Sequence, residues 1–353
     1  MGAWQSVTGR MGVAVVGAGY WGPNLVRNLA ASPRFRLRWV CDLDEDRARR
    51  VGGYYGGVRT TPRLEDVLDD PEVTAVVVAT PAATHAPLGR QVLDAGKHLL
   101  LEKPLATTYE DGLALTELAE ARGLTLMCDH TYCYTPAVRK IREYIHDGTL
   151  GDVQYADSVR INLGLVQPDV TVLWDLAPHD LSILDFVLPA DRRPTAIAAH
   201  SADPLRTGRA CIAFLTLQMP DDAVGHVHVN WLSPHKIRTL VIGGSKRMLL
   251  WDDLRPQQRL SLFDRGIDLH GPDLGSEDRR EALVSYRTGD MLAPALPERE
   301  ALADVMEEFG QAIEERRAPL TDGRAGLRVL SALEAAERSV AARGTFVDLR
   351  SRA

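Results

Sequence analysis

A histidine follows an aspartate by four residues in the segment 175–180, and this pair has side chains suited to proton transfer. On a helix, Asp175 and His179 would share one face. A histidine can accept a hydroxyl proton near neutral pH, and the aspartate would orient either the imidazole or the substrate. Structural alternatives stay open, with His179 as a satisfied core histidine and Asp175 as a helix N-cap. Asp180 is either a supporting carboxylate or a first-turn charge favoured by the helix dipole.

A lysine stands at the end of an apolar run, in the sequence Glu102-Lys103-Pro104. Pro104 has no N–H and favours an extended backbone at Lys103. Beside a bound ligand the ammonium would donate a hydrogen bond to a substrate hydroxyl; at an ordinary strand end it would be a solvated charge. The segment 79–81, with His85 shortly after it, ends another apolar run. In open α/β sheets, ligands bind outside such carboxyl ends of strands.

A glycine motif of the form G-x-G-x-x-G runs from Gly17 to Gly22. An apolar strand is expected before it, over 13–16, and a helix after it, over 24–31. In this context Gly17 allows the tight turn, Gly19 lets the backbone approach a pyrophosphate, and Gly22 lets helix and strand pack closely. The helix N-terminus then presents N–H groups and a partial positive charge to the phosphates. The motif therefore predicts a dinucleotide site.

An acidic residue ends the second expected strand at the distance that a dinucleotide fold requires. Asp42 can hydrogen-bond both ribose hydroxyls of NAD and would repel the 2′-phosphate of NADP, so NAD is favoured. Arg47, Arg49 and Arg50 keep NADP open as the minor alternative, because one of them could turn towards a phosphate. The structural alternative is a surface loop in which Asp42 caps a helix.

Hydrophobic periodicity divides the chain into two parts. Strands alternate with helices in the first part, which predicts a parallel, doubly wound sheet. Strands are expected over 13–16, 37–41, 73–79, 98–101 and 124–128, and helices over 24–31, 44–51, 87–95 and 109–122. The second part predicts an antiparallel meander with one helix before it, over 175–188, and two after it, over 298–317 and 323–342. Its strands are expected over 153–164, 195–202, 210–219, 223–231, 237–242 and 248–251, with polar loops over 252–257 and 271–280.

Composition excludes several classes of protein. The 353 residues include 41 Lys and Arg against 48 Asp and Glu, a net charge of −7, which disfavours nucleic-acid and acidic-membrane partners. No apolar run approaches the roughly 18 residues needed for a membrane span. Residues 1–10 lack signal-peptide character and are interpreted as a short leader. The cysteines, at 41, 128, 133 and 211, lack zinc-site spacing and are expected to be reduced core thiols in a cytoplasmic protein with no metal.

From about residue 12 to residue 349 the chain resembles the Gfo/Idh/MocA family, named for glucose–fructose oxidoreductase and inositol dehydrogenase. The marks are the glycine turn, the segments 79–81, 95–98 and 102–105, the Asp175–His179 pair, and Tyr286-Arg287-x-Gly289-Asp290. The resemblance implies an N-terminal Rossmann domain over 11–130. It also implies a C-terminal α+β domain over 131–353, with a large open, mainly antiparallel sheet, that binds substrate and forms a homodimer or homotetramer. Its C-terminal helices would pack back towards the Rossmann domain.

The resemblance also implies an NAD(P)-dependent enzyme that oxidises or reduces a sugar, cyclitol or related polyol, with NAD as cofactor. The implied catalytic residues are Lys103, Asp175 and His179. The expected cofactor-binding residues are Gly17, Gly19, Tyr20, Trp21, Gly22, Asp42, Thr80, Pro81, His85, Glu102 and Lys103.

The segments 134–140, 162–169 and 230–234, with Lys236 and Arg238, look most like members that act on nucleotide-linked sugars. His130 departs from the family, in which many members have Asn followed by Arg-Phe, and this puts the shape of the sugar pocket in doubt. The candidates to line that pocket, each also plausible as a packing residue, are His130, Tyr132, Arg160, Asn162 and Trp174.

Three other functions remain as alternatives. They are an inositol or free-sugar dehydrogenase, a glycoside hydrolase that uses bound NAD transiently, and a regulator that binds NAD without turnover. The presence of Lys103, Asp175 and His179 disfavours the regulator. Accumulation of NADH would separate a dehydrogenase from a hydrolase.

Overall fold

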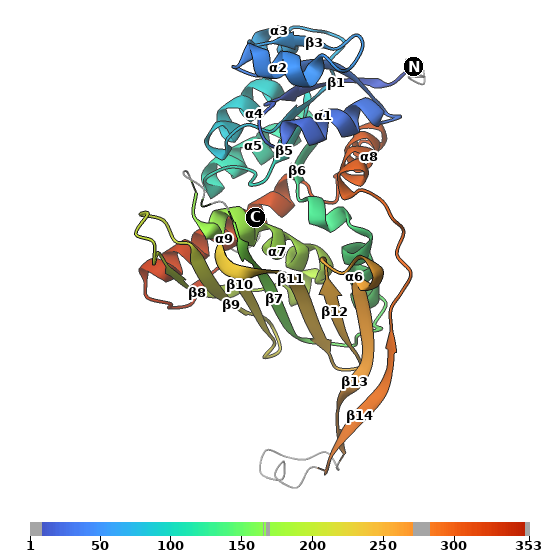
Figure 1. Ribbon diagram of the computed structural model, residues 1–353, viewed down its shortest axis with the longest axis vertical. Helices are drawn as coiled ribbons and strands as arrows, with labels where there is room; N and C mark the ends of the chain where they lie inside the picture. Colours follow the sequence, from blue (N-terminus) through green and yellow to red (C-terminus); the bar gives the residue numbers. More distant parts are fainter. Residues whose placement is uncertain (1–8, 165, 167–169, 271–282, 350–353) are drawn as a thin grey trace. The chain divides into compact units, whose positions relative to one another are not determined.

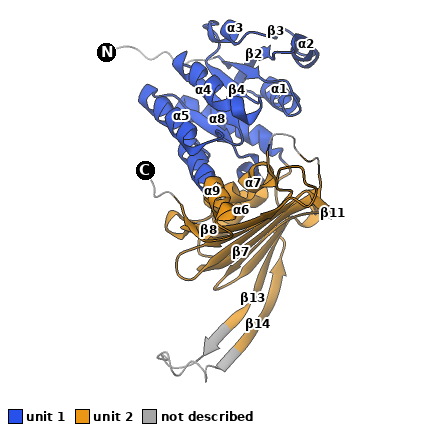
Figure 2. Ribbon diagram, turned by 90° about the vertical axis from the view of Figure 1, so that its left-hand side faces the viewer, with its two compact units in different colours: residues 1–135, 299–331 blue, residues 136–298, 332–353 orange. Residues whose placement is uncertain are grey.

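A computed structural model describes residues 9–164, 166, 170–270 and 283–349. The chain forms two compact units (Figure 2). Unit 1 comprises Met1–Thr135 and Arg299–Ser331, and unit 2 comprises Pro136–Glu298 and Ala332–Ala353. Most of the expected leader, positions 165 and 167–169 of the segment 162–169, and the expected loop 271–280 lie outside the described residues. In the described part of the chain, no helix is long and apolar enough to cross a membrane.

Unit 1 is built on a six-stranded parallel sheet of order β3-β2-β1-β4-β5-β6, which confirms the predicted doubly wound fold. The order reverses between β1 and β4, and ligands of such sheets bind outside the carboxyl ends at that point. The strands are β1 (Met11–Val16), β2 (Phe35–Cys41), β3 (Arg59–Thr61), β4 (Ala75–Val78), β5 (His98–Glu102) and β6 (Leu126–Asp129). The helices are α1 (Gly22–Ala31), α2 (Glu45–Gly52), α3 (Leu64–Leu68), α4 (His85–Asp94), α5 (Tyr109–Arg122) and α8 (Ala301–Glu315).

The structure differs from the sequence prediction at the short elements of unit 1. The strand β3 and the helix α3 were not predicted, because three to five residues carry too little periodicity to be recognised. By contrast β4, all four residues of which are fully buried, matches the prediction of an apolar strand covered on both faces. Hydrophobic periodicity therefore predicts the buried central strands of unit 1 better than its short outer elements.

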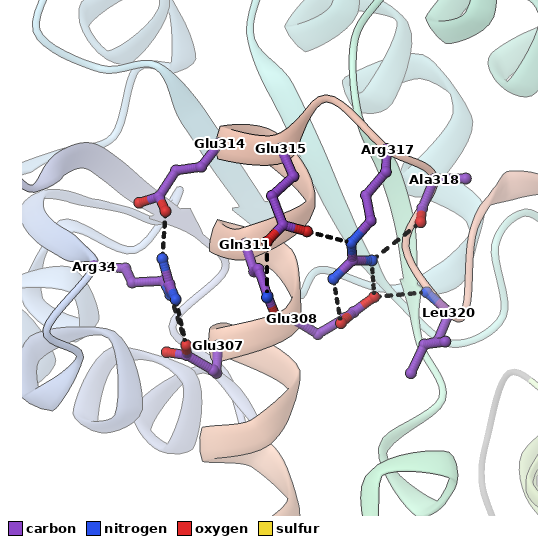
Figure 3. Close-up of polar contacts among 9 residues, drawn as sticks. All are labelled: Arg34, Glu307, Glu308, Gln311, Glu314, Glu315, Arg317, Ala318 and Leu320. Atoms are coloured by element: carbon purple, nitrogen blue, oxygen red, sulfur yellow. Dashed lines mark hydrogen bonds and ion pairs between the residues drawn. The ribbon is translucent and has the colours of Figure 1, made fainter. Parts of the chain in front are cut away.

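Ion pairs join α8, which comes late in the chain, to the rest of unit 1 (Figure 3). Arg34 contacts Glu307 at 2.7 Å, which ties α8 to the segment before β2. Glu308, the next residue of α8, is buried, and its carboxylate accepts two bonds from Arg317, at 2.7 and 2.9 Å, and one from Leu320 N–H at 2.8 Å, both beyond the end of the helix. These contacts hold the chain that leaves α8 in one path.

That chain runs along the outer edge of β6. Cys128 N–H donates to Thr321 O at 2.8 Å, and Thr321 Oγ1 donates back to Cys128 O at 2.7 Å. The Tyr134 hydroxyl lies 2.9 Å from Thr321 Oγ1 and is fully buried. The carboxyl end of β6, with Asp129 as its last residue, is thus fixed by a segment almost 200 residues further along the chain.

Unit 2 is built on a nine-stranded sheet of order β14-β13-β12-β11-β7-β10-β9-β8-β15, shown in Figure 1. Its strands are β7 (Val153–Leu163), β8 (Ala196–Ala202), β9 (Ile212–Gln218), β10 (Val224–Asn230), β11 (Leu232–Gly244), β12 (Met248–Asp252), β13 (Leu260–His270), β14 (Leu283–Leu292) and β15 (Val347–Asp348). Its helices are α6 (Pro136–His146), α7 (Val172–Val187) and the last part of α9 (Gly323–Ala341).

The sheet of unit 2 is mainly antiparallel, as predicted, but it is not a simple meander. β7 lies between β10 and β11 and runs parallel to β10. The chain passes from one side of β7 to the other at Trp231, which is 2% exposed. The hydrophobic pattern of a single strand does not show which strands are its neighbours. The position of β7 between β10 and β11 could therefore not be predicted, because β7 is separated from the other strands in the sequence by α7. The helix α6 and the strands β13 and β14 were also not predicted. The family motif Tyr286-Arg287-x-Gly289-Asp290 lies in β14.

One face of this sheet is covered by helices. The helix α7 contacts β7, β9 and β10, and Ser339 Oγ of α9 accepts a bond from Ala199 N–H of β8 at 2.8 Å. Along β9 and β10 buried residues alternate with exposed ones, which is the pattern of a sheet with one covered face. The other face carries Phe214 and Val224, which are 45% and 46% exposed.

Candidate active site

The glycine loop of unit 1 connects β1 to α1, and two of its glycines are required by the fold itself. Gly17 has φ +99°, and a Cβ there would lie 2.5 Å from Ala79 O. A Cβ at Gly22 would lie 2.3 Å from Gly17 O. A Cβ at Gly19, in contrast, would meet open space in the described structure. Gly19 therefore leaves room for a ligand to approach the backbone, as the pyrophosphate of a dinucleotide does.

The N-terminus of α1 has the features of an anion site. Its N-cap residue is Trp21, and an indole has no acceptor with which to cap N–H groups. The first-turn N–H groups and the positive end of the helix dipole are thus left to a phosphate. Tyr20 is 94% exposed and Trp21 is 37% exposed, so both rings present flat surfaces beside this loop.

Asp42, at the end of β2, is hydrogen-bonded to the glycine loop. Its Oδ2 accepts Ala18 N–H at 2.7 Å, and its Oδ1 accepts Asp44 N–H at 2.9 Å. Arg47 lies 3.4 Å from Asp42 and also contacts Asp44. Asp44, and not Asp42, is the N-cap of α2, so the capping alternative for Asp42 is wrong. The residues of the loop fit a dinucleotide, with a carboxylate beside the turn.

His85 joins the loops that follow β4 and β5. Its Nδ1 lies 2.8 Å from Pro104 O, and its Nε2 lies 2.9 Å from Thr80 O. The ring is 1% exposed, and this burial lowers the pKa of His85 although both backbone contacts oppose the shift. His85 thus contacts the Thr80–Pro81 and Pro104–Leu105 peptides, and a neutral ring can donate to only one of the two carbonyls at a time.

Lys103 follows β5 directly, at the carboxyl edge of the sheet where the glycine loop also lies. Its N–H donates to Glu102 Oε2 at 3.2 Å. Glu102 is paired in register with Asp129 of β6. His130 is next in the chain and is 1% exposed, and Tyr132 is half-buried in the short helix Thr131–Tyr134.

In unit 2, Asp175 and His179 lie on α7, four residues apart and both partly exposed. Trp231 Nε1 donates to Asp175 Oδ2 at 3.1 Å, and Ser182 Oγ donates to His179 O at 2.9 Å. The N-cap of α7 is Thr171, so the alternative that Asp175 caps the helix is wrong. The structure thus fixes the Asp175 carboxylate and leaves both side chains accessible on one helix.

Arg160 and Asp180 form an ion pair that is buried on both sides, with exposures of 3% and 2%. Arg160 donates from Nε at 2.7 Å and from an η-nitrogen at 3.1 Å, and Ser158 Oγ adds a bond at 2.8 Å. Asp180 sits in the middle of α7 and not in its first turn, so the dipole interpretation does not apply. This placement favours a packing role for Arg160, which joins β7 to α7, over contact with a substrate.

The two remaining pocket candidates are in different surroundings. Trp174 Nε1 donates to Glu337 Oε1 of α9 at 2.6 Å, which links the first turn of α7 to the last part of the chain. Asn162 is half-buried near the end of β7. Sequence reasoning missed Asp129 and the contact of Trp231 with Asp175. A carboxylate directly after an apolar strand is the one signal that could have identified Asp129.

Comparison with known proteins agrees with these features. The model of an oxidoreductase family with an NAD-binding Rossmann fold matches residues 11–130, and the model of the GFO/IDH/MocA C-terminal domain matches residues 138–250. A UDP-N-acetylglucosamine 3-dehydrogenase of Acidithiobacillus ferrooxidans is 29% identical over 91% of this chain and 95% of its own length. An inositol 2-dehydrogenase of Rhizobium meliloti is 26% identical over 93% and 96%.

Solved structures give the same result. That of the Acidithiobacillus ferrooxidans enzyme has a TM-score of 0.79 at 26% identity and covers 94% of this chain and 98% of its own. GenD2 from gentamicin A biosynthesis, solved in complex with NAD, has a TM-score of 0.80 at 26% identity and covers 99% of both chains. The chain therefore belongs to the Gfo/Idh/MocA oxidoreductase family, and its N-terminal part is the NAD-binding Rossmann fold of that family.

Proposed function

We propose that this oxidoreductase transfers a hydride between NAD and a secondary hydroxyl or ketone of a sugar, most specifically of a nucleotide-linked sugar. The observation that carries the proposal is the accessible Asp175–His179 pair on α7, in a chain that also has Lys103 at the carboxyl edge of the NAD-binding sheet. The similarity to a UDP-N-acetylglucosamine 3-dehydrogenase over nearly its whole length supports the nucleotide-linked class. The inositol 2-dehydrogenase supports the broader class of polyols.

The glycine loop and the N-terminus of α1 would hold the pyrophosphate, and Asp42 would accept hydrogen bonds from the adenosine ribose. Bound NAD would supply the hydride acceptor. His179 would take the proton of the reacting hydroxyl. Lys103 would donate a hydrogen bond to the substrate oxygen as negative charge develops on it. In enzymes, removal of one such donor raises the activation free energy by about 2.7–4 kcal/mol. In the reducing direction His179 would return the proton.

A substrate screen tests this function. Nucleotide sugars, free sugars and inositols are each incubated with NAD, and formation of NADH is followed by its absorbance. Net NADH with a nucleotide sugar supports the proposal, and net NADH only with an inositol or free sugar supports the broader alternative. Turnover without net NADH would indicate the hydrolase. NAD binding without any turnover would indicate the regulator.

Two variants then test the residue roles. Lys103→Met and His179→Gln are expected to lower kcat by about 100-fold or more, with little change in NAD affinity. His146→Gln, at an exposed position at the end of α6, is the matched control and should leave kcat unchanged. Asp175→Asn should lower kcat less than His179→Gln does if the carboxylate only orients the sugar. The loss of kcat should be larger if the carboxylate holds the imidazole. Near-native turnover of His179→Gln would exclude this histidine as the base.

We also propose that unit 2 forms a two-fold dimer through the sheet face that its helices do not cover. Phe214, Val224 and Ile237 lie in strands of this sheet with 45%, 46% and 38% of their surface exposed. An apolar sheet face is costly to leave in water, and a second copy would cover it. Phe214→Asp should therefore lower the sedimentation coefficient at micromolar concentration. A monomeric native protein would contradict the proposal.

A further inference from the structure

Two carboxyl groups lie side by side at the carboxyl edge of the unit 1 sheet. Glu102 is the last residue of β5, and Asp129 is the last residue of β6. They are direct partners in the parallel register, so their side chains leave the same face of the sheet about 5 Å apart. Asp129 is 1% exposed. No step of the proposed reaction uses either group, so their proximity needs its own explanation.

Each carboxyl has one oxygen with a donor and one without. Thr131 Oγ1 donates to Asp129 Oδ1 at 2.7 Å, and Lys103 N–H donates to Glu102 Oε2 at 3.2 Å. The second oxygens, Asp129 Oδ2 and Glu102 Oε1, are buried and receive no N–H or hydroxyl from the described part of the chain. These two oxygens belong to side chains that are direct neighbours in the strand register. Carboxylate oxygens only accept, so a hydrogen bond between the two groups requires a proton on one of them.

The surroundings favour retention of that proton. Burial raises the pKa of Glu102 well above its usual range, and the neighbouring Asp129 raises it further, while Lys103 opposes the shift. Burial raises the pKa of Asp129 as well. The other titratable neighbours are the thiols of Cys128 and Cys133, the Tyr134 hydroxyl and the imidazole of His130, all buried. Burial raises the pKa of Cys128 and of Tyr134, so both remain uncharged.

We propose that Glu102 and Asp129 hold one proton between them at neutral pH, and that the single negative charge of this pair positions Lys103 for the reaction. The pair then balances one lysine charge, whereas a doubly ionised pair would draw the ammonium towards the sheet and away from a substrate. Glu102 and Asp129 are thus positioning residues. The second half of this inference rests on the proposed function of Lys103, and the first half does not.

Isosteric variants distinguish a shared proton from two ionised carboxylates. Asp129→Asn replaces one partner by an amide that can donate to Glu102, so one negative charge and one hydrogen bond are kept. Glu102→Gln makes the same replacement from the other side, but Glu102 is also an expected cofactor-binding residue, so this variant is used only for the spectroscopic and stability measurements. Asp129→Asn should retain turnover at neutral pH within a few-fold of the native enzyme. Because this variant has no shared proton to lose, it should lack the decline in kcat at alkaline pH that the proposal predicts for the native enzyme.

The double variant Glu102→Gln with Asp129→Asn removes the charge as well. It should lower kcat roughly tenfold, a smaller loss than that expected for Lys103→Met. Retained NAD binding shows that this variant is folded. If Asp129→Asn lowers kcat at neutral pH as much as the double variant does, the native pair is doubly ionised and the proposal is wrong. If the double variant keeps the native kcat and pH profile, the positioning role is wrong.

Two measurements need no sugar substrate. Infrared difference spectra at neutral pH should contain the C=O stretch of a protonated carboxylic acid in the native protein, and both single variants should lack it. The folded native chain also binds more protons than the unfolded chain, because the pKa is raised on folding. Its unfolding equilibrium constant should therefore rise about tenfold per pH unit above the ordinary carboxyl pKa, and the single variants should flatten that slope. Absence of the band together with an unchanged slope would overturn the shared proton, whatever substrate the enzyme takes.

Discussion

The charge of Asp42 should set the choice between NAD and NADP, and Asp42→Asn isolates that charge. Its side-chain oxygen can still accept Ala18 N–H, which lies 2.7 Å from Asp42 Oδ2 in the native protein. The glycine loop should therefore keep its position while the negative charge is lost. Asp42→Ala, in contrast, removes the loop contact as well and should weaken both cofactors.

The size of the effect follows from burial and distance. Asp42 is 9% exposed, so solvent screens it poorly. A 2′-phosphate about 4 Å away, at an effective dielectric of about 20, would be repelled by about 4 kcal/mol. Arg47, 3.4 Å from the carboxylate, cancels part of this repulsion. We take about 1.4–2.7 kcal/mol as the net discrimination, which corresponds to a 10- to 100-fold preference for NAD.

Calorimetric titration of both cofactors into the native protein and the variants tests this reasoning. The ratio of NADP to NAD dissociation constants should fall by about 10- to 100-fold in Asp42→Asn. Adding Arg47→Ala to that variant should remove part of the gain in NADP affinity, because Arg47 released from Asp42 becomes available to the phosphate. The reasoning is refuted if the native protein binds NADP more tightly, or if Asp42→Asn leaves the ratio unchanged.

The remaining predictions concern stability, which urea unfolding followed by tryptophan fluorescence can measure. Arg160→Met leaves the buried Asp180 carboxylate without its cation and with only the Ser158 hydroxyl as a donor, so the free energy of unfolding should fall by about 3–5 kcal/mol. Adding Asp180→Leu should recover most of that loss. An equal loss in the double variant would contradict this. Burial lowers the pKa of His85, so the unfolded chain binds more protons below about pH 6.5 and acid destabilises the protein. His85→Asn should weaken that dependence; His98, whose pKa burial also lowers, should retain its own share.

Local sequence relations predicted the features that local geometry determines. The motif from Gly17 to Gly22 predicted a strand–turn–helix, and the structure explains two of the glycines by the contacts that a Cβ would make. The spacing of Asp175 and His179 predicted a shared helix face, because a helix brings residues four apart together whatever surrounds it. These predictions need only the regular geometry of one element.

Roles that depend on a second element could not be obtained in this way. Arg160 looked available for a substrate, and only the packing of α7 on β7 shows that its guanidinium faces Asp180. His85 looked like a cofactor contact, yet its partners are the backbone oxygens of Thr80 and Pro104, at the ends of two different strands. In each case the partner lies 5 to 20 residues away and belongs to no repeating pattern. The sequence therefore identified chemically capable side chains without showing which of them were already hydrogen-bonded inside the protein.

The Glu102–Asp129 pair shows why strand register carries functional information that composition does not. A shift of β6 by one residue relative to β5 would turn Asp129 to the opposite face of the sheet and separate the two carboxyls. The register of β6 is held on its other edge by Thr321, whose own path is set by the bonds of Glu308 to Arg317 and to the backbone beyond α8. The ion pair between the buried Glu308 carboxylate and Arg317 thus contributes to the position of the proton that we propose beside Lys103. A substitution that breaks the Glu308–Arg317 pair should therefore shift the pH at which kcat declines on the alkaline side. The effect would pass through the position of β6, because neither residue belongs to the carboxyl pair.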